Sequence, residues 1–203
     1  MTNPAPIIDL SFPHNWEAEV LSARPLILPP RHFVYPLQAE EVERGALEVL
    51  VRPGAPDELR QKHPLYAQQF LATFALGFRD PAVPTGLWSC PEPEELCAVS
   101  GGYAYLIHTA APERFTMLPY RPVLEVRPVL DEQLLLFIGH RNILAWGRQS
   151  EAWQSEKLSD EGLTITGLES GVLRGLGWEM RTDKEMHFAL DLRTGCRLSS
   201  PQN

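Results

Sequence analysis

Three polar side chains that could do chemistry lie side by side between two apolar runs. His140, Arg141 and Asn142 are consecutive, and the apolar runs 134–138 and 143–146 enclose them. If the two runs pair as a hairpin, these side chains lie at one rim of a sheet, where loops commonly carry binding residues. An ordinary polar hairpin turn has the same composition. We treat His140, Arg141 and Asn142 as candidate binding residues.

Two adjacent carboxylates, Asp160 and Glu161, form a second polar turn. Adjacent side chains point in different directions, so the pair cannot supply a general acid and a nucleophile without a partner from elsewhere in the fold. Short polar side chains in turns also bond their own backbone. Both are candidate binding residues. Together with His140 they would line the pocket of a small hydrolase, a hypothesis that predicts a histidine and a carboxylate within hydrogen-bond reach.

Tryptophan supplies another candidate surface. Four of the five tryptophans, Trp88, Trp146, Trp153 and Trp178, fall at or after residue 88. Tryptophan is enriched at interface hot spots, so an exposed set would form a recognition patch, and Trp153 is taken as a candidate binding residue. The alternative is that they fill the core and bond their indole N–H groups to carbonyls.

Metal and cofactor motifs are absent from the sequence. Six residues separate Cys90 from Cys97, whereas about two to four residues separate the cysteines of zinc sites, and no two histidines have metal-ligand spacing. The nucleophile elbow, the phosphate-binding loop and the dinucleotide fingerprint are also missing. Gly175 and Gly177 form only a fragment of that fingerprint, which we interpret as a tight passage between strands. We expect no metal and no cofactor.

Charge and cysteine content limit the partners and the compartment. The chain has 26 acidic and 18 basic side chains, a formal charge of -8, and its mean field repels phosphate backbones and anionic membranes. We expect neither nucleic acid nor a membrane as a partner. The start lacks a signal-peptide pattern, and three cysteines, an odd number, fit a reducing compartment. We expect a cytoplasmic protein.

The elements that position these residues are predicted to be short strands. Nineteen prolines in 203 residues argue for many short elements and few, short helices, because proline interrupts helices and sheet centres. Short apolar runs separated by turns are typical of antiparallel sandwiches, barrels and propellers. No helical pattern separates them, which disfavours a parallel α/β sheet. The predicted strands are 96–99, 103–107, 123–129, 134–138, 143–146, 163–165 and 187–192.

The first part of the chain is less regular. The proline-punctuated stretches 25–30 and 33–37 are expected to run outside the fold or to pair at a sheet edge. Residues 46–51 are predicted to form a strand that a turn closes. Residues 57–78 fit either a helix or, in part, a buried strand, and the sequence leaves that choice open.

A weak internal repeat favours a sandwich- or propeller-like arrangement. A shift of 38 residues superimposes Gly101, Gly139 and Gly177, and also Phe115 on Trp153. Propeller blades recur at about 40 to 50 residues. In a chain with fourteen glycines, coincidence explains the same alignment.

No flexible linker interrupts the sequence, so one domain is predicted over 1–203, with an irregular half, 1–94, and a β-rich half, 95–195. For function we predict a non-enzymatic binding or interaction module. Its partner is another protein or a second copy of the chain, because exposed sheet edges must be paired or covered. A small hydrolase with the pocket described above is the alternative.

Overall fold

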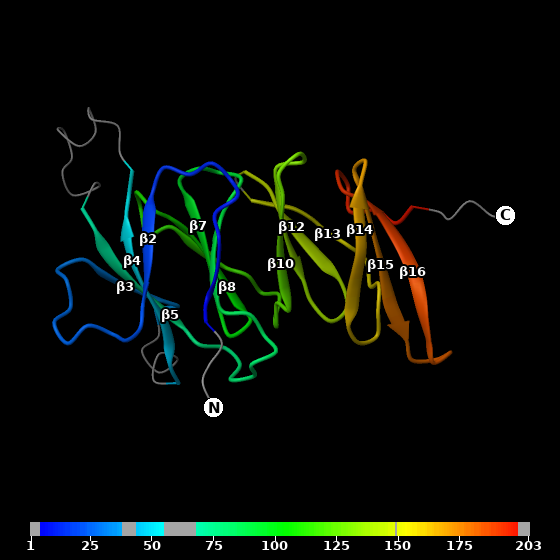
Figure 1. Ribbon diagram of the computed structural model, residues 1–203, viewed down its shortest axis with the longest axis horizontal. Helices are drawn as coiled ribbons and strands as arrows, with labels where there is room; N and C mark the ends of the chain where they lie inside the picture. Colours follow the sequence, from blue (N-terminus) through cyan, green and yellow to red (C-terminus); the bar gives the residue numbers. More distant parts are fainter. Residues whose placement is uncertain (1–4, 38–43, 55–67, 149, 199–203) are drawn as a thin grey trace. The chain divides into compact units, whose positions relative to one another are not determined.

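A computed structural model describes residues 5–37, 44–54, 68–148 and 150–198. These residues form sixteen β-strands in four mostly antiparallel sheets, with no helix among them (Figure 1). The mainly β, sandwich-like architecture is therefore confirmed, and the few short helices that we expected are not found in the described residues. In that part of the chain no helix is long and apolar enough to span a membrane. The chain divides into two compact units, Met1–Pro122 and Val123–Asn203.

The first unit contains a five-stranded and a four-stranded sheet. The five-stranded sheet has the order β1 (Ile7–Asp9), β6 (Gly86–Ser89), β7 (Glu95–Ser100), β8 (Tyr103–His108) and β9 (Phe115–Met117). The four-stranded sheet has the order β2 (Glu17–Leu21), β4 (Ala46–Arg52), β5 (Phe70–Ala75) and β3 (His32–Tyr35). Only the pairs β1–β6 and β3–β5 are parallel. Residues 33–35 of the predicted stretch 33–37 thus lie at a sheet edge, which is one of the two positions that we expected for it.

One apolar core joins the two sheets of this unit. Val49 and Phe74 from the four-stranded sheet and Ile107 from the five-stranded sheet belong to the same buried cluster. Two buried tyrosines bond their hydroxyls to carbonyls, Tyr35 to Pro112 at 2.7 Å and Tyr105 to Ala75 at 2.9 Å. Burying these rings therefore leaves no hydroxyl unsatisfied.

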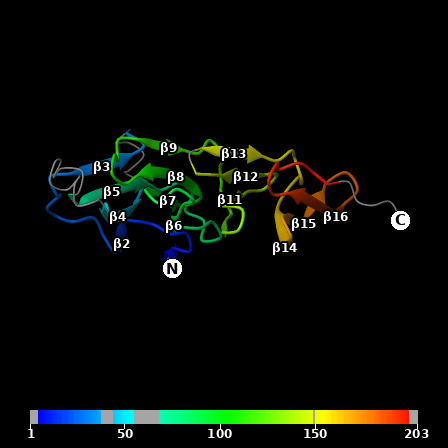
Figure 2. The same cartoon turned by 90° about the horizontal axis from the view of Figure 1, so that it is seen from above.

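The second unit pairs a four-stranded with a three-stranded sheet, both fully antiparallel (Figure 2). The first has the order β10 (Glu125–Val129), β11 (Leu134–Ile138), β12 (Ile143–Trp146) and β13 (Glu151–Gln154). The second has the order β14 (Leu163–Glu169), β15 (Val172–Glu179) and β16 (Lys184–Asp191). Leu136 and Ile143 from one sheet and Phe188 from the other lie in a common core.

Strand β15 corrects our interpretation of Gly175 and Gly177. They do not connect two strands but lie inside the central strand of the three-stranded sheet. A Cβ atom at Gly175 would lie 2.3 Å from the ring of Phe188, and one at Gly177 would lie 2.2 Å from the carbonyl oxygen of Leu158. The glycines let neighbouring groups approach the strand closely, which is one of the uses of glycine in strands.

The remaining sequence predictions have mixed outcomes. The 38-residue repeat and the propeller are not confirmed: Gly101 and Gly139 lie between the strands of hairpins, whereas Gly177 lies within a strand. Of the ambiguous stretch 57–78, residues 70–75 form β5, and 57–67 lie outside the described residues. The half predicted to be irregular, 1–94, contributes six whole strands, and the single domain over 1–203 stays a prediction.

Candidate functional site

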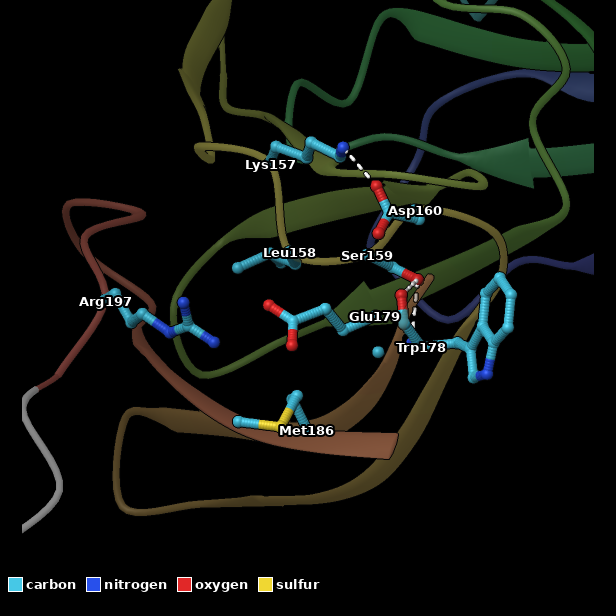
Figure 3. A pocket seen from close by; sticks show the side chains of 9 residues that line it. Lys157, Leu158, Ser159, Asp160, Trp178, Glu179, Met186 and Arg197 are labelled. Carbon is cyan, nitrogen blue, oxygen red and sulfur yellow. Dashed lines mark hydrogen bonds and ion pairs between the residues drawn. The ribbon is translucent and has the colours of Figure 1, made fainter. Parts of the chain in front are cut away.

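A cavity of about 250 Å³ opens in the second unit, and Asp160 lines it. Its walls come from the loop that follows β13, from the end of β15, from β16 and from the segment after β16 (Figure 3). The lining residues are Lys157, Leu158, Ser159, Asp160, Gly177, Trp178, Glu179, Met186 and Arg197. Of the six candidate residues, this cavity contains Asp160 alone.

Ser159 fastens the loop to strand β15. Its Oγ accepts the backbone N–H groups of Trp178, at 2.9 Å, and Glu161, at 3.2 Å, and donates to the Trp178 carbonyl at 3.1 Å. Backbone N–H groups of Leu158 and Ser159 also donate to the carbonyl oxygen of Arg141, at 2.7 and 3.2 Å. Because Ser159 is 4% exposed and its hydroxyl is already hydrogen-bonded, its role is to hold the loop against β15.

Asp160 is held in its ionised form. The Lys157 ammonium donates to one carboxylate oxygen, and the backbone N–H of Met180 donates to the other at 2.7 Å. The Lys157 hydrogen bond and then the Met180 hydrogen bond hold the pKa of Asp160 below its usual value, and the nearby Arg141 charge adds to them. A carboxylate with both oxygens occupied and a lowered pKa is suited to holding the loop rather than to donating a proton.

Glu179 and Arg197 bring opposite charges to the cavity. The Glu179 carboxylate accepts the hydroxyl of Thr182 at 2.6 Å, and an Arg197 guanidinium nitrogen lies 3.7 Å from Glu156. Figure 3 shows the Glu179 carboxylate and the Arg197 guanidinium pointing toward each other. Neither residue was a sequence candidate, because Glu179 ends the unrecognised strand β15 and Arg197 follows the last strand.

The other candidate residues do not converge on this cavity. His140, Arg141 and Glu161 are exposed and Asn142 is half-buried, and none of the four lines the cavity. Arg141 reaches the loop only through its backbone carbonyl and its charge. This cavity therefore does not provide the pocket of His140, Asp160 and Glu161 that the predicted hydrolase would use.

The tryptophans do not form a surface patch. Trp153 is 8% exposed, and its indole Nε1–H donates to the Leu192 carbonyl at 2.7 Å, which makes it part of the core. Trp16, Trp88 and Trp146 are also buried, and Trp178 is half-buried. Core filling therefore accounts for four of the five tryptophans, Trp153 included.

Two histidine–carboxylate arrangements occur in the first unit, and sequence reasoning missed both. His108 Nε2 lies 2.9 Å from a Glu94 oxygen, and its buried Nδ1 has no hydrogen-bond partner in the described part of the chain. Elsewhere, His32 Nε2 lies 2.9 Å from Thr73 Oγ1, which donates to Glu48 Oε2 at 2.6 Å. The His32, Thr73 and Glu48 side chains meet only through the register of β3, β4 and β5, a long-range pairing that no local spacing reveals.

These buried groups are poor nucleophiles. Thr73 is fully buried, so substrate cannot reach its hydroxyl. Burial lowers the pKa of His32, and the Arg24 charge lowers it further against the opposing effect of Glu48. Cys90 and Cys97 are fully buried as well, and burial raises the pKa of both thiols. A thiol with a raised pKa carries little thiolate and reacts slowly.

An exposed apolar loop joins β2 to β3. Leu26, Ile27 and Leu28 have relative exposures of 104%, 89% and 41%. Prolines 25, 29 and 30 bracket them. Since β2 and β3 are the outer strands of the four-stranded sheet, the loop connects its two edges. We call Leu26, Ile27 and Leu28 the apolar loop. The sequence predicted its outer position but not its exposure.

In the described residues, no group of three or more His, Cys, Asp or Glu side chains is arranged to hold a metal ion. Comparison of the chain with protein-family models and with curated proteins found no match.

Proposed function

We propose that the protein is a non-enzymatic interaction module that binds a partner protein through the apolar loop. The observation that carries the proposal is the exposure of three consecutive aliphatic side chains, at 104%, 89% and 41% for Leu26, Ile27 and Leu28. Singly exposed apolar residues are common on protein surfaces, whereas contiguous exposed apolar patches mark binding sites.

The loop is suited to insertion into an apolar groove of the partner. Full burial of one aliphatic side chain contributes about 1.5–3 kcal/mol, so the nearly fully exposed Leu26 and Ile27 contribute roughly 3–6 kcal/mol before the costs of association, and the 41%-exposed Leu28 adds a smaller share. The bracketing prolines fix their own φ angles and so reduce the conformational entropy that the loop loses on binding. The loop is thus partly preorganised for a protein partner.

A protein partner fits the loop better than a lipid surface. Residues that anchor proteins at the membrane interface are typically Trp and Tyr, and residues 22–31 contain neither. The formal charge of -8 also opposes approach to anionic lipids. A cytoplasmic setting belongs to the same proposal, supported by the three unbridged cysteines.

The non-enzymatic assignment is supported by the state of four potential nucleophiles, Ser159, Thr73, Cys90 and Cys97, whereas the Cys196 thiol is exposed. The Ser159 hydroxyl is bonded to backbone groups, and the Thr73 hydroxyl and the Cys90 and Cys97 thiols are buried. The hydrolase alternative stays a prediction.

The experiment compares a triple variant, Leu26→Ser/Ile27→Ser/Leu28→Ser, with the matched control Leu130→Ser/Met180→Ser. The control residues are exposed by 46% and 64% in the second unit. A partner captured from the source cells by wild type and control, identified and then purified, should bind the triple variant at least about 100-fold more weakly, a loss of roughly 2.7 kcal/mol.

Two outcomes would contradict the proposal. One is equal affinity of the purified partner for wild type and triple variant. The other is a triple variant whose thermal unfolding is strongly destabilised, because an exposed loop should contribute little to stability. Sedimentation of wild type and triple variant separates a second copy of the chain from a different partner. If the partner is a second copy, the wild type sediments as a dimer and the triple variant as a monomer.

A further inference from the structure

The cavity of the second unit holds two opposite charges that face each other without meeting. Glu179 ends strand β15, and Arg197 lies in the segment that follows β16. Their charged groups point toward each other in Figure 3, and no ion pair joins them in the described part of the chain, where Arg197 pairs with Glu156 instead. The space between a carboxylate and a guanidinium is therefore available to a molecule that carries both charges.

We propose that this cavity binds a free amino acid with an apolar side chain. The α-ammonium group lies against the Glu179 carboxylate, and the α-carboxylate lies against the Arg197 guanidinium. A purely anionic ligand would be repelled by Glu179 and a purely cationic one by Arg197. A zwitterion satisfies both, and guanidinium–carboxylate contacts are among the stronger hydrogen bonds in proteins.

The contacts that Glu179 and Arg197 already make leave both side chains available to a ligand. The Glu156–Arg197 contact measures 3.7 Å between side chains that are 59% and 41% exposed, and exposed ion pairs of this kind contribute little. Exchanging Glu156 for a ligand carboxylate therefore costs little. On Glu179, the Thr182 hydroxyl occupies Oε2, which leaves Oε1 for an ammonium group.

The backbone around the cavity is fixed. Arg197 forms a bridge to Leu190, and the N–H of Leu198 donates to the Ala189 carbonyl at 2.8 Å, so the segment that carries Arg197 is tied to β16. On the other side, Ser159 ties the loop to β15, as described above. The charged groups thus project from a scaffold that does not need to rearrange to bind a ligand.

The other walls select the side chain of the ligand. Met186 is 45% exposed, lies below the two charged groups in Figure 3 and presents apolar surface, whereas Leu158 above them is 5% exposed and belongs to the core. Lys157 and Asp160 neutralise each other, so they add no net charge to the cavity. A volume of about 250 Å³ accommodates one amino acid, and the flexible thioether of Met186 suits an aliphatic side chain such as that of leucine or methionine.

The test is calorimetric titration of the full chain with L-leucine, 4-methylpentanoate and 3-methylbutylamine. The last two are leucine without its ammonium group and leucine without its carboxylate. Leucine should bind detectably at concentrations up to about 10 mM, and removal of either charge should weaken binding at least about tenfold. L-Methionine should bind comparably to leucine.

Variants of Glu179 and Arg197 test which side chain binds which charged group of leucine. Glu179→Gln and Arg197→Gln should each weaken leucine binding at least about tenfold, whereas the exposed neighbours Glu185→Gln and Arg193→Gln should not change it. Circular dichroism of every variant verifies the fold. The proposal is overturned if the folded wild type gives no heat with leucine or methionine, if either single-charge analogue binds as tightly as leucine, or if the cavity variants bind leucine as the wild type does.

Discussion

Replacing Thr73 with valine should destabilise the first unit strongly although the side chain keeps nearly the same shape. Thr73 is fully buried, and its hydroxyl links two titratable residues, His32 and Glu48. Because Thr73 donates its proton to Glu48, it accepts from the His32 Nε2–H. Glu48 is itself 6% exposed and lies opposite Thr73 in the register of β4 and β5. Valine therefore leaves a buried carboxylate without its hydroxyl donor.

The expected magnitude follows from these contacts. A hydrogen bond to a charged group contributes about 1.5–3 kcal/mol, and the imidazole N–H left without an acceptor costs about 1 kcal/mol more. We expect Thr73→Val to lower the free energy of unfolding by about 3 kcal/mol. Since small proteins are stable by about 5–15 kcal/mol, the loss is readily measured.

The assay is urea-induced unfolding at neutral pH, followed by circular dichroism and tryptophan fluorescence. Thr73→Ser is the matched control, because it keeps the hydroxyl and removes one buried methyl group, which costs about 1 kcal/mol. The double variant Thr73→Val/Glu48→Leu removes the stranded carboxylate as well. It should recover most of the stability, since apolar residues can replace a buried polar pair at little cost.

Two results would refute this reasoning. If the free energy of unfolding of Thr73→Val lies within about 0.5 kcal/mol of that of Thr73→Ser, the hydrogen bonds of the hydroxyl contribute nothing beyond ordinary packing. If the double variant is no more stable than Thr73→Val, the stranded carboxylate is not the cause of the loss.

Three further predictions test other parts of the structure. The pKa of His32 is below its usual 6.5, so below pH 6.5 the unfolded state takes up the proton first and the stability of the fold decreases as the pH is lowered. His32→Gln should therefore make the urea midpoint depend less on pH when it is measured from pH 8 to 5. Gly177→Ala should lower the melting temperature by several degrees because its Cβ would lie 2.2 Å from the Leu158 oxygen, whereas Gly167→Ala, with nothing within 4 Å, should not. The pKa of Asp160 is also lowered, so its ionised form stabilises the fold above pH 3.8, and this stabilisation is lost as the pH falls through the pKa of the folded state. Asp160→Asn should remove this contribution from the acid unfolding curve.

The strands of the second unit show what local sequence can predict. The runs 134–138 and 143–146 became β11 and β12 without a change of bounds, because each is a continuous apolar run with turn residues on both sides. Strand β15 was missed, since two glycines and an arginine interrupt its apolar pattern. Those glycines are explained only by the Phe188 ring and the Leu158 carbonyl, which other segments bring against the strand.

The difference between local and long-range contacts also explains which residues of the cavity could be predicted from the sequence. Asp160 could be identified because it belongs to a local turn, but its position in the cavity depends on the hydrogen bonds that tie this turn to β15 and to Met180. Glu179 and Arg197 could not, since strand pairing and the chain segment after β16 bring them to the same cavity. The buried pair Thr73 and Glu48 is likewise a product of register between distant strands. Side chains that meet only through long-range pairing leave no pattern of spacing in the sequence.

Exposure of the apolar loop is the clearest case in which composition alone is ambiguous. Residues 26–28 and 134–136 are both runs of three aliphatic residues, yet Leu134, Leu135 and Leu136 are exposed by 7%, 0% and 0%. What separates them is the flanking sequence, because proline cannot donate to a strand ladder and keeps residues 25–30 out of a sheet interior. A run excluded from the sheets lacks the apolar cover that a sheet provides, and in the described part of the chain Leu26 and Ile27 remain 104% and 89% exposed. A partner that supplies an apolar surface would remove the cost of hydrating both side chains, which is the physical basis for proposing a binding role for this loop rather than for the polar turn at His140.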